Sequence, residues 1–326
     1  MCSFLERMRL TRYAAPALQP YRVLELPGLM APENREPLGS KSKIWLRHQT
    51  DAEAPRLPRL LFKYNRDDKG EDWSEKIAAE LAGLIGLPHA EVELATYNGD
   101  HGVAIVDFAN SGGLALFHGN ELFELADPSY ANVRKKHGAL QHTPAAVLSA
   151  LSRISNLRAV TSLAPPSGVT DAFGFFVGYL MLDALIGNTD RHHENWGILA
   201  GRAGRRFLAP SYDHASSLGR ELTDAKRTAV GHPRHGSPVE RYVRRARSAF
   251  YASDGSGRQL SPVEAFLDAA QFRPEAAAGW LERLAALTTE EMRTIVEMIP
   301  DSRMTLIARA FTCALLEHNA RILLAR

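Results

Sequence analysis

The sequence predicts an α+β fold of two lobes, in which a small mixed N-lobe precedes a mainly helical C-lobe. Short apolar runs bounded by turn residues, the pattern typical of strands, are concentrated before residue 112. Apolar residues at three- and four-residue steps, the pattern typical of amphipathic helices, dominate the chain after residue 142. With 326 residues, 45% of them hydrophobic, the chain is long enough to bury the core of such a bilobal protein.

Composition and charge exclude several classes of protein. The net charge of +2 gives no general attraction to nucleic acid, so we expect no direct nucleic-acid binding. The two cysteines, Cys2 and Cys313, lie far apart, which excludes a disulfide framework and indicates a reducing compartment. The N-terminus lacks the apolar core of a secretory signal. The most apolar segment, 173–186, is too short to span a membrane and contains Asp183. We therefore expect a cytoplasmic protein without a membrane partner.

The N-lobe is expected over residues 38–112, after an N-terminal extension, 1–37, whose role the sequence does not indicate. Residues 38–47 are typical of a small-residue turn that enters a strand. Exposed backbone N–H groups in this turn, together with Lys43, would suit a triphosphate.

One lysine lies inside the apolar run 59–64. A lysine in a strand built for burial needs a charged or polar partner, so Lys63 either pairs with an acid or points outward from an edge strand. The next helix is predicted over 73–85, where Gly86 ends it. This helix offers Glu75 and Glu80 as candidate partners.

The chain then forms a predicted hairpin and enters the C-lobe. Residues 90–108 are expected to pair around Asn98-Gly99, a dipeptide favoured in tight β turns. The lobe boundary is placed at residue 112, in a Ser-Gly-Gly stretch, and the C-lobe covers 113–326. The helices expected in the C-lobe cover residues 142–160, 171–186, 262–270, 274–287, 289–298 and 303–324.

The densest polar cluster of the chain is the sequence Gly-Asn-Thr-Asp-Arg-His-His-Glu-Asn-Trp at 187–196. It follows a helix of buried character and precedes further apolar runs, the last of which ends at a second carboxylate, Asp213. Polar residues on a loop held between buried elements are a common place for chemistry.

Phosphoryl transfer fits the spacing of this cluster. The reaction needs a carboxylate that accepts the proton of the attacking hydroxyl, and oxygen ligands for Mg²⁺. In protein kinases the catalytic-loop Asp is followed five residues later by a metal-binding Asn, and a strand-end Asp supplies the other metal contact. Asp190 and Asn195 have this spacing, and Asp213 ends an apolar run. We therefore expect Asp190 to act as the base or to orient the attacking hydroxyl, and Asn195 and Asp213 to bind Mg²⁺.

A metal site built from His192, His193 and His214, in a phosphohydrolase or a zinc enzyme, is the alternative. Adjacent histidines point to different sides of a loop or helix, so His192 and His193 suit shared chelation poorly. The set of two aspartates and one asparagine suits a hard cation better.

The same residues resemble a known family. Asp-Arg-His-x-x-Asn at 190–195 resembles the catalytic loop of the lipid-kinase branch of the protein-kinase-like fold. The longer string Leu-Ile-Gly-Asn-Thr-Asp-Arg-His at 185–192, followed by Leu-Ala-Pro-x-Tyr-Asp-His-Ala-Ser-Ser-Leu-Gly at 208–219, resembles the HipA-like bacterial serine/threonine kinases. The resemblance covers roughly residues 38–220 and implies a bilobal protein-kinase-like fold with ATP and Mg²⁺ in the cleft.

The resemblance also implies roles in the N-lobe. Gly39 and Lys43 match the nucleotide-covering turn of the family. Lys63 matches the lysine that contacts the nucleotide phosphates. Glu75 is its implied partner because the family's glutamate lies eleven residues before the same Gly-Leu ending, and Glu80 is the alternative.

Two further assignments follow from the kinase comparison. The hairpin strands would lead into the hinge between the lobes, where Asp107 and Phe108 would carry backbone groups that bind adenine. His192 would contact the transferring phosphate or make a structural hydrogen bond, and the sequence leaves both roles open.

The predicted function is therefore ATP- and Mg²⁺-dependent transfer of the γ-phosphoryl group to a Ser or Thr hydroxyl of a protein. Many HipA-like proteins are toxins held by an antitoxin and act on translation components, so the resemblance implies partners of these kinds. A lipid or small-molecule kinase would share every residue named, because these residues act on ATP and not on the acceptor. A regulatory nucleotide-binding protein would share the fold, although the intact set of acids and lysine argues for an active site.

Overall fold

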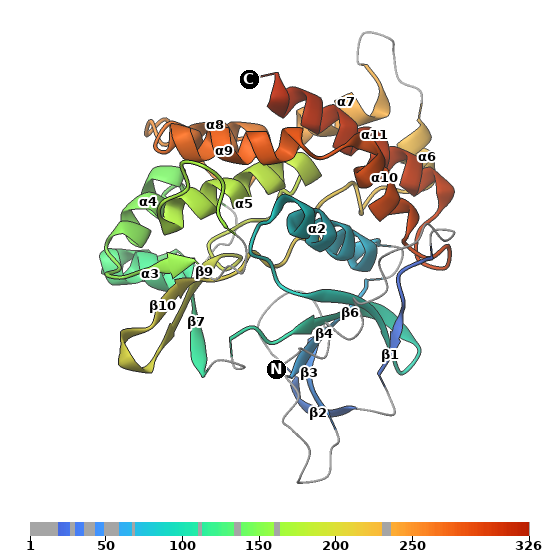
Figure 1. The fold of residues 1–326 in the computed structure, drawn as a ribbon, viewed down its shortest axis with the longest axis horizontal. Helices are drawn as coiled ribbons and strands as arrows, with labels where there is room; N and C mark the ends of the chain where they lie inside the picture. Colours follow the sequence, from blue (N-terminus) through green and yellow to red (C-terminus); the bar gives the residue numbers. More distant parts are fainter. Residues whose placement is uncertain are drawn as a thin grey trace.

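The computed structural model describes residues 19–26, 30–35, 43–48, 59–66, 69–109, 113–133, 138–159, 164–229 and 236–325. Figure 1 shows a sheet at one end of the molecule, a helical part at the other end, and helix α2 between them. This arrangement confirms the predicted α+β fold of a small mixed lobe and a mainly helical lobe. Gly39 and the lobe boundary placed at residue 112 lie outside the described residues.

The first sheet has six strands in the order β1-β5-β6-β4-β3-β2, with β1 parallel to β5 and the other neighbouring pairs antiparallel. Asn98 and Gly99, both with positive φ, form the tight turn of the predicted hairpin between β5 and β6. The strands are β1 (Leu24–Glu25), β2 (Met30–Arg35), β3 (Lys43–His48), β4 (Leu60–Tyr64), β5 (Val92–Tyr97) and β6 (Asp100–Val106).

Helix α2 (Glu71–Ile85) covers one face of this sheet (Figure 1). Side chains alternate along the strands, so Val103 and Ile105 pack in the same core as α2, whereas Ala104 packs with Phe62 on the opposite face. Because Phe62 points away from α2, its neighbour Lys63 points toward the side on which α2 lies. The alternation thus directs one lysine of a buried strand toward the helix.

Helix α5 (Ala172–Ile186) is the centre of the helical lobe. All of its fifteen residues are buried, and Asp171 caps its N-terminus by accepting a hydrogen bond from the N–H of Gly174. Gly187, in the left-handed conformation, ends the helix immediately before the polar loop. The helices packed around α5 include α4 (Pro144–Ser152), α8 (Pro262–Ala270), α9 (Pro274–Ala285) and α11 (Leu306–Leu324).

A second sheet flanks the helices, in the order β7-β9-β10-β8. Its strands are β7 (Leu114–His118), β8 (Arg158–Ala159), β9 (Gly197–Gly201) and β10 (Arg206–Leu208). The other helices are α3 (Gly119–Ala126), α6 (Asp224–Thr228), α7 (Pro238–Arg245) and α10 (Thr289–Glu297), with short 3₁₀ helices η2 (Pro128–Asn132) and η3 (Arg202–Gly204).

The two largest differences from the predicted helix boundaries are at the end of α4 and the start of α11. The helix expected over 142–160 ends at Ser152, because the chain turns at Asn156, which has a φ of 55°, and then pairs as β8 with β10. The helix expected from residue 303 begins at Leu306, where the side chain of Thr305 provides the cap.

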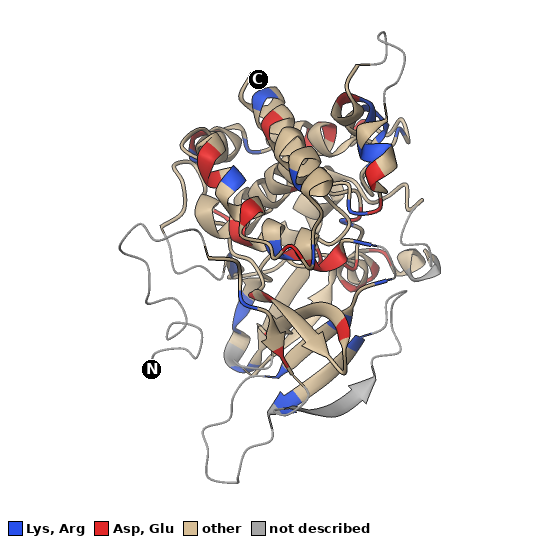
Figure 2. Cartoon of the chain, turned by 90° about the vertical axis from the view of Figure 1, so that its right-hand side faces the viewer, with Lys and Arg blue, Asp and Glu red and all other residues tan. Residues whose placement is uncertain are grey.

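Charged residues of both signs are interspersed over the described part of the molecule in the view of Figure 2, in keeping with the small net charge. Among the described helices, none combines the length and the apolar character needed to cross a membrane.

Candidate active site

The site begins with three charged side chains that meet between the two lobes. Lys63 lies on β4, and its Nζ is 3.1 Å from Oδ1 of Asp213 and 3.8 Å from Oε2 of Glu75. Glu80, the alternative partner, instead pairs with Lys76 at 2.9 Å. The structure therefore places Glu75, and not Glu80, beside Lys63.

A second lysine lies on the same face of the sheet. Lys43 of β3 is directly opposite Lys63 of β4, and opposed residues of antiparallel strands point to the same face. Both lysines therefore point to the same face of the sheet, where ammonium groups could bind the phosphates of a nucleotide.

Glu75 also holds the backbone that follows Asp213. Its fully buried carboxylate accepts hydrogen bonds from the N–H groups of His214, at 2.7 Å, and Ala215, at 3.1 Å. Asp213 has a φ of 58°, in the left-handed region that non-glycine residues seldom adopt. The bonds to Glu75 thus fix a strained turn and connect α2, β4 and Asp213 into one unit.

These contacts shift the pKa values of Glu75 and Lys63. Burial raises the pKa of the Glu75 carboxyl, but the charge of Lys63 and the hydrogen bond from His214 outweigh burial, so the pKa lies below its ordinary value of 4.5. Burial lowers the pKa of Lys63, but Asp213 and Glu75 outweigh that effect and raise it. Both groups are charged at neutral pH.

The lowered pKa of Glu75 predicts how the free energy of unfolding depends on pH. A carboxyl whose pKa is lower in the folded protein contributes stability above its ordinary pKa of 4.5, and this contribution is lost as pH falls through the folded value. We expect Glu75→Gln to lower the free energy of unfolding most near pH 7, and the difference from wild type to shrink below about pH 4. Urea denaturation at a series of pH values measures it.

The exposed Glu282 provides the control, since Glu282→Gln removes a carboxylate without a buried partner. Its free energy of unfolding should follow the wild type throughout the pH range. A Glu75→Gln difference that stays constant between about pH 7 and about pH 3 would contradict the assignment.

The polar loop 188–195 connects α5 to β9, and its shape depends on its own residues. The N–H of Asp190 donates to Oδ1 of Asn188 at 3.0 Å. The carbonyl of Asp190 accepts from the N–H of His192 and from Nδ2 of Asn195, both at 2.7 Å. The bond from Asn195 closes the loop on the backbone of Asp190 and places the two predicted functional residues together.

The carboxylate of Asp190 is 28% exposed and lies beside Ser216 and His192. Oδ2 accepts a hydrogen bond from the hydroxyl of Ser216 at 3.2 Å, and Oδ1 lies 3.8 Å from Nε2 of His192. Nδ1 of His192 accepts from the N–H of Glu194, so the neutral ring carries its proton on Nε2, which faces Asp190. A partly exposed carboxylate held in this way can accept the proton of an incoming hydroxyl.

A buried ion pair between Arg191 and Asp183 joins the loop to α5. Arg191 donates through Nε and Nη2 to both carboxylate oxygens of Asp183 on α5, and the two side chains are 2% and 4% exposed. The same guanidinium donates to the carbonyl of Asn195 at 3.0 Å and to the hydroxyl of Ser211 at 2.9 Å. Arg191 therefore links α5, the loop and the segment that leads to Asp213.

Asn195 and Asp213 offer the donors that Mg²⁺ prefers. Nδ2 of Asn195 is bound to the carbonyl of Asp190, which leaves Oδ1 as the amide atom suited to a cation. The carboxylate of Asp213 is 30% exposed beside Lys63. One carboxylate and one amide oxygen, with water completing the shell, fit a hard divalent cation.

The alternative metal site of three histidines finds no support in the geometry. Nδ1 of His193 is hydrogen-bonded to the hydroxyl of Tyr130 at 2.7 Å, and Nε2 of His214 to that of Ser211 at 2.6 Å. Nδ1 of His192 is engaged with Glu194. Within the described ranges, no three His, Cys, Asp or Glu side chains are grouped as metal ligands.

The predicted hinge residues lie beside the loop. The N–H of Asp107 donates to the carbonyl of Arg59, and its carboxylate accepts from the side chain of Arg59 at 2.7 Å and from the N–H of Ala109 at 3.1 Å. The ring of Phe108 packs on that of Tyr212 at 5.6 Å between centroids. These contacts hold the backbone of Asp107 and Phe108 in place, and their predicted contact with adenine stays a prediction.

Sequence reasoning missed several residues of this site. Tyr212 donates its hydroxyl to the carbonyl of Glu194 and contacts Nδ1 of His118 at 2.9 Å, which connects the loop with β7. Ser216 contacts Asp190, and Asp183 anchors Arg191. Asp183 carried a signal, since it is the one charged residue in a segment otherwise built for burial.

Comparison with known proteins places this geometry in a family. The profile of the HipA-like C-terminal domain family matches residues 38–297, which is most of the chain. The chain belongs to the HipA-like C-terminal domain family. No curated protein sequence matches it significantly.

Two solved structures resemble this HipA-like chain. The Helicobacter pylori proinflammatory kinase CtkA superposes with a TM-score of 0.70 at 18% identity, over 93% of this chain and 96% of CtkA. HipA in the Shewanella oneidensis MR-1 toxin–antitoxin complex with HipB and operator DNA gives a TM-score of 0.47 at 13% identity, over 98% of this chain and 68% of that one. The similarity to CtkA confirms the predicted bilobal kinase-like fold.

Proposed function

We propose that this HipA-like protein is an ATP- and Mg²⁺-dependent kinase that phosphorylates a Ser or Thr hydroxyl of a protein. The observation that carries the proposal is the ion cluster of Lys63, Glu75 and Asp213, which adjoins a loop that presents Asp190. Family membership and the kinase-like fold support the same conclusion.

The proposed site residues form two groups, of which one would bind the phosphates of ATP and the other Mg²⁺. Lys63, fixed by Glu75, binds the phosphates of ATP, and Lys43 adds positive charge on the same face. Asn195 and Asp213 would hold Mg²⁺, which when bound neutralises charge on the phosphate oxygens.

The reaction follows from this placement. The acceptor hydroxyl oxygen forms a bond to the γ-phosphorus, and the bond from that phosphorus to the bridging oxygen breaks. The electron pair leaves with ADP, and the hydroxyl proton passes to Asp190. Ser216 and His192 orient the carboxylate of Asp190.

The test is transfer of radiolabelled γ-phosphate from ATP to protein in a cell lysate. We expect wild type to label a protein band, and Lys63→Met and Asp213→Ala each to reduce labelling by at least about a hundredfold, because both remove contacts to the charged phosphates. Asp254→Ala, at an exposed turn, is the matched control and should label normally. Label found in the lipid extract, and not in protein, would indicate a lipid kinase. Binding of ATP without any transfer would indicate a regulatory nucleotide-binding protein.

Family membership also supports partners as part of the proposal. The acceptor is proposed to be a cytoplasmic protein, with components of translation as the first candidates, and an antitoxin is proposed as a binding partner. Affinity purification of the protein from its host, followed by identification of the proteins that remain bound, tests for the antitoxin.

A further inference from the structure

A second pocket lies outside the proposed ATP site. It has a volume of about 340 Å³, within the range of small-molecule sites, and lies between α5, α7, α8 and α11. Ala184 and Gly187, at the end of α5, form its inner wall. None of the proposed catalytic, nucleotide-binding or metal-binding residues lines it, so the pocket is separate from the proposed chemistry.

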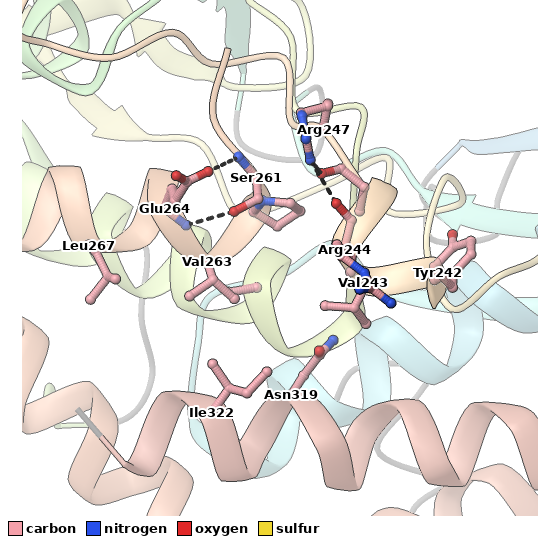
Figure 3. A pocket seen from close by; sticks show the side chains of 14 residues that line it. Tyr242, Val243, Arg244, Arg247, Ser261, Val263, Glu264, Leu267, Asn319 and Ile322 are labelled. Atoms are coloured by element: carbon pink, nitrogen blue, oxygen red, sulfur yellow. Dashed lines mark hydrogen bonds between the residues drawn. The ribbon is translucent and has the colours of Figure 1, made fainter. Parts of the chain in front are cut away.

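The body of the pocket is apolar. Val243 of α7, Leu267 of α8 and Ile322 of α11 line it. Figure 3 shows Ile322 and Asn319 rising from α11 toward the side chains of α8 and α7. Three helices thus present aliphatic groups to one half-open pocket, which favours an apolar ligand body.

One buried polar atom in the wall lacks a partner. The side chain of Asn319 is 1% exposed, and its Nδ2 donates to the carbonyl of Leu185 at 2.9 Å. Its Oδ1 accepts no hydrogen bond from the described residues. An unpaired buried acceptor costs about 1–3 kcal/mol, and native proteins leave few of them. Because Oδ1 is itself closed to solvent, it offers a pocket ligand no accessible acceptor, and the wall stays apolar at Asn319.

The mouth of the pocket is positively charged. Arg244 and Arg247 both line it, and Nη1 of Arg247 donates to the carbonyls of Arg244 and Ala246, which holds its guanidinium in place. The acid in the lining, Glu264, is engaged by the side chain of Arg258 and by the N–H of Ser261. The N-terminus of α8, which favours negative charge, also faces the pocket.

We propose that this pocket binds a small amphiphilic anion. The apolar body of the ligand lies among Val243, Leu267 and Ile322, and its anionic group lies at Arg247. Such a ligand is not a nucleoside triphosphate, and its binding needs no catalytic turnover.

The test uses 1-anilinonaphthalene-8-sulfonate, a fluorescent probe with an aromatic body, a sulfonate and an anilino N–H. We expect saturable binding at one site per chain, measured by fluorescence titration and by calorimetric stoichiometry. N-phenyl-1-naphthylamine, which keeps the rings and the N–H but lacks the sulfonate, is the matched neutral probe. Comparison of the two probes isolates the contribution of charge.

Two kinds of variant assign the site. Arg247→Glu should weaken binding of the sulfonate probe by at least about tenfold and leave the neutral probe nearly unchanged, because only the sulfonate meets the reversed charge. Arg245→Glu, the same change on an exposed neighbour that does not line the pocket, should leave both probes unchanged. Leu267→Trp fills the apolar space and should abolish binding of both probes, and Ile322→Trp provides a second filled variant should the first not fold.

Binding of the sulfonate probe that is equal in Arg247→Glu and Arg245→Glu would overturn the proposal, as would unchanged binding in a folded pocket-filled variant. These measurements contain no ATP and no acceptor. Failure of the pocket proposal therefore leaves the kinase proposal standing, and loss of kinase activity in a test of Asp213 leaves the pocket proposal standing.

Discussion

Alanine in place of Asp190 is expected to slow phosphoryl transfer by about 10²–10⁴-fold while changing ATP affinity by less than about threefold. The carboxylate of Asp190 is the group that accepts the hydroxyl proton in the proposed reaction, and it contacts Ser216 and His192, whereas Lys63 pairs with Glu75 and Asp213. The loop itself is held by the backbone of Asp190, through its N–H and its carbonyl. Alanine should therefore remove the base without collapsing the loop.

Single-turnover labelling with radiolabelled ATP measures the rate, and titration with a fluorescent ATP analogue measures affinity. Glu194→Gln neutralises another carboxylate of the same loop and serves as the control, since the described contact of Glu194 with Tyr212 uses its backbone carbonyl. We expect its rate to stay within a few-fold of wild type. A folded Asp190→Ala protein that transfers phosphate within about tenfold of the wild-type rate would rule out Asp190 as the base.

The second large effect is on stability. Asp183→Leu should lower the free energy of unfolding by about 3–5 kcal/mol, because it leaves the guanidinium of Arg191 buried without a counter-charge. In the wild type, burial lowers the pKa of Arg191, but the negative charge of Asp183 outweighs burial and raises that pKa above its ordinary value. Urea denaturation followed by circular dichroism measures the change.

A double variant separates the lost charge from the lost shape. Replacing both members, Asp183→Leu with Arg191→Met, should recover part of the stability, since an apolar pair of similar volume carries no buried charge. Recovery should be incomplete because Arg191 also donates to Asn195 and Ser211. Glu317→Gln breaks an exposed ion pair with Arg293 and should cost less than about 1 kcal/mol. A single Asp183→Leu variant as stable as Glu317→Gln would contradict the importance of the buried pair.

The parts of the site that could be predicted from sequence are those encoded by local spacing. Asp190 and Asn195 lie in one loop, and the five-residue interval is visible without a structure. Lys63 stood out because a lysine inside an apolar run needs a partner, and the structure pairs it with Glu75. The catalytic roles of these residues, and those of Gly39 and Lys43 in nucleotide binding, stay predictions.

Contacts between distant parts of the chain could not be predicted in this way. Glu75 accepts hydrogen bonds from the backbone of His214 and Ala215, and no side-chain pattern in the sequence marks those N–H groups. The helix expected over 142–160 ended early because β8 pairs with β10, a long-range contact that outweighs local helix spacing. Asp183 could have been found from the sequence, since an isolated acid in an apolar segment needs a buried partner, but it was used only as an argument against a membrane span.

The complete burial of α5 has a consequence for how the chain acquires its fold. A helix without a polar face cannot remain soluble alone, and its main packing partners, α8, α9 and α11, are all synthesised after it. During translation α5, which ends directly before the polar loop, cannot be buried until the last third of the chain has been synthesised. We therefore expect the proposed active site to form only after the C-terminal helices have left the ribosome.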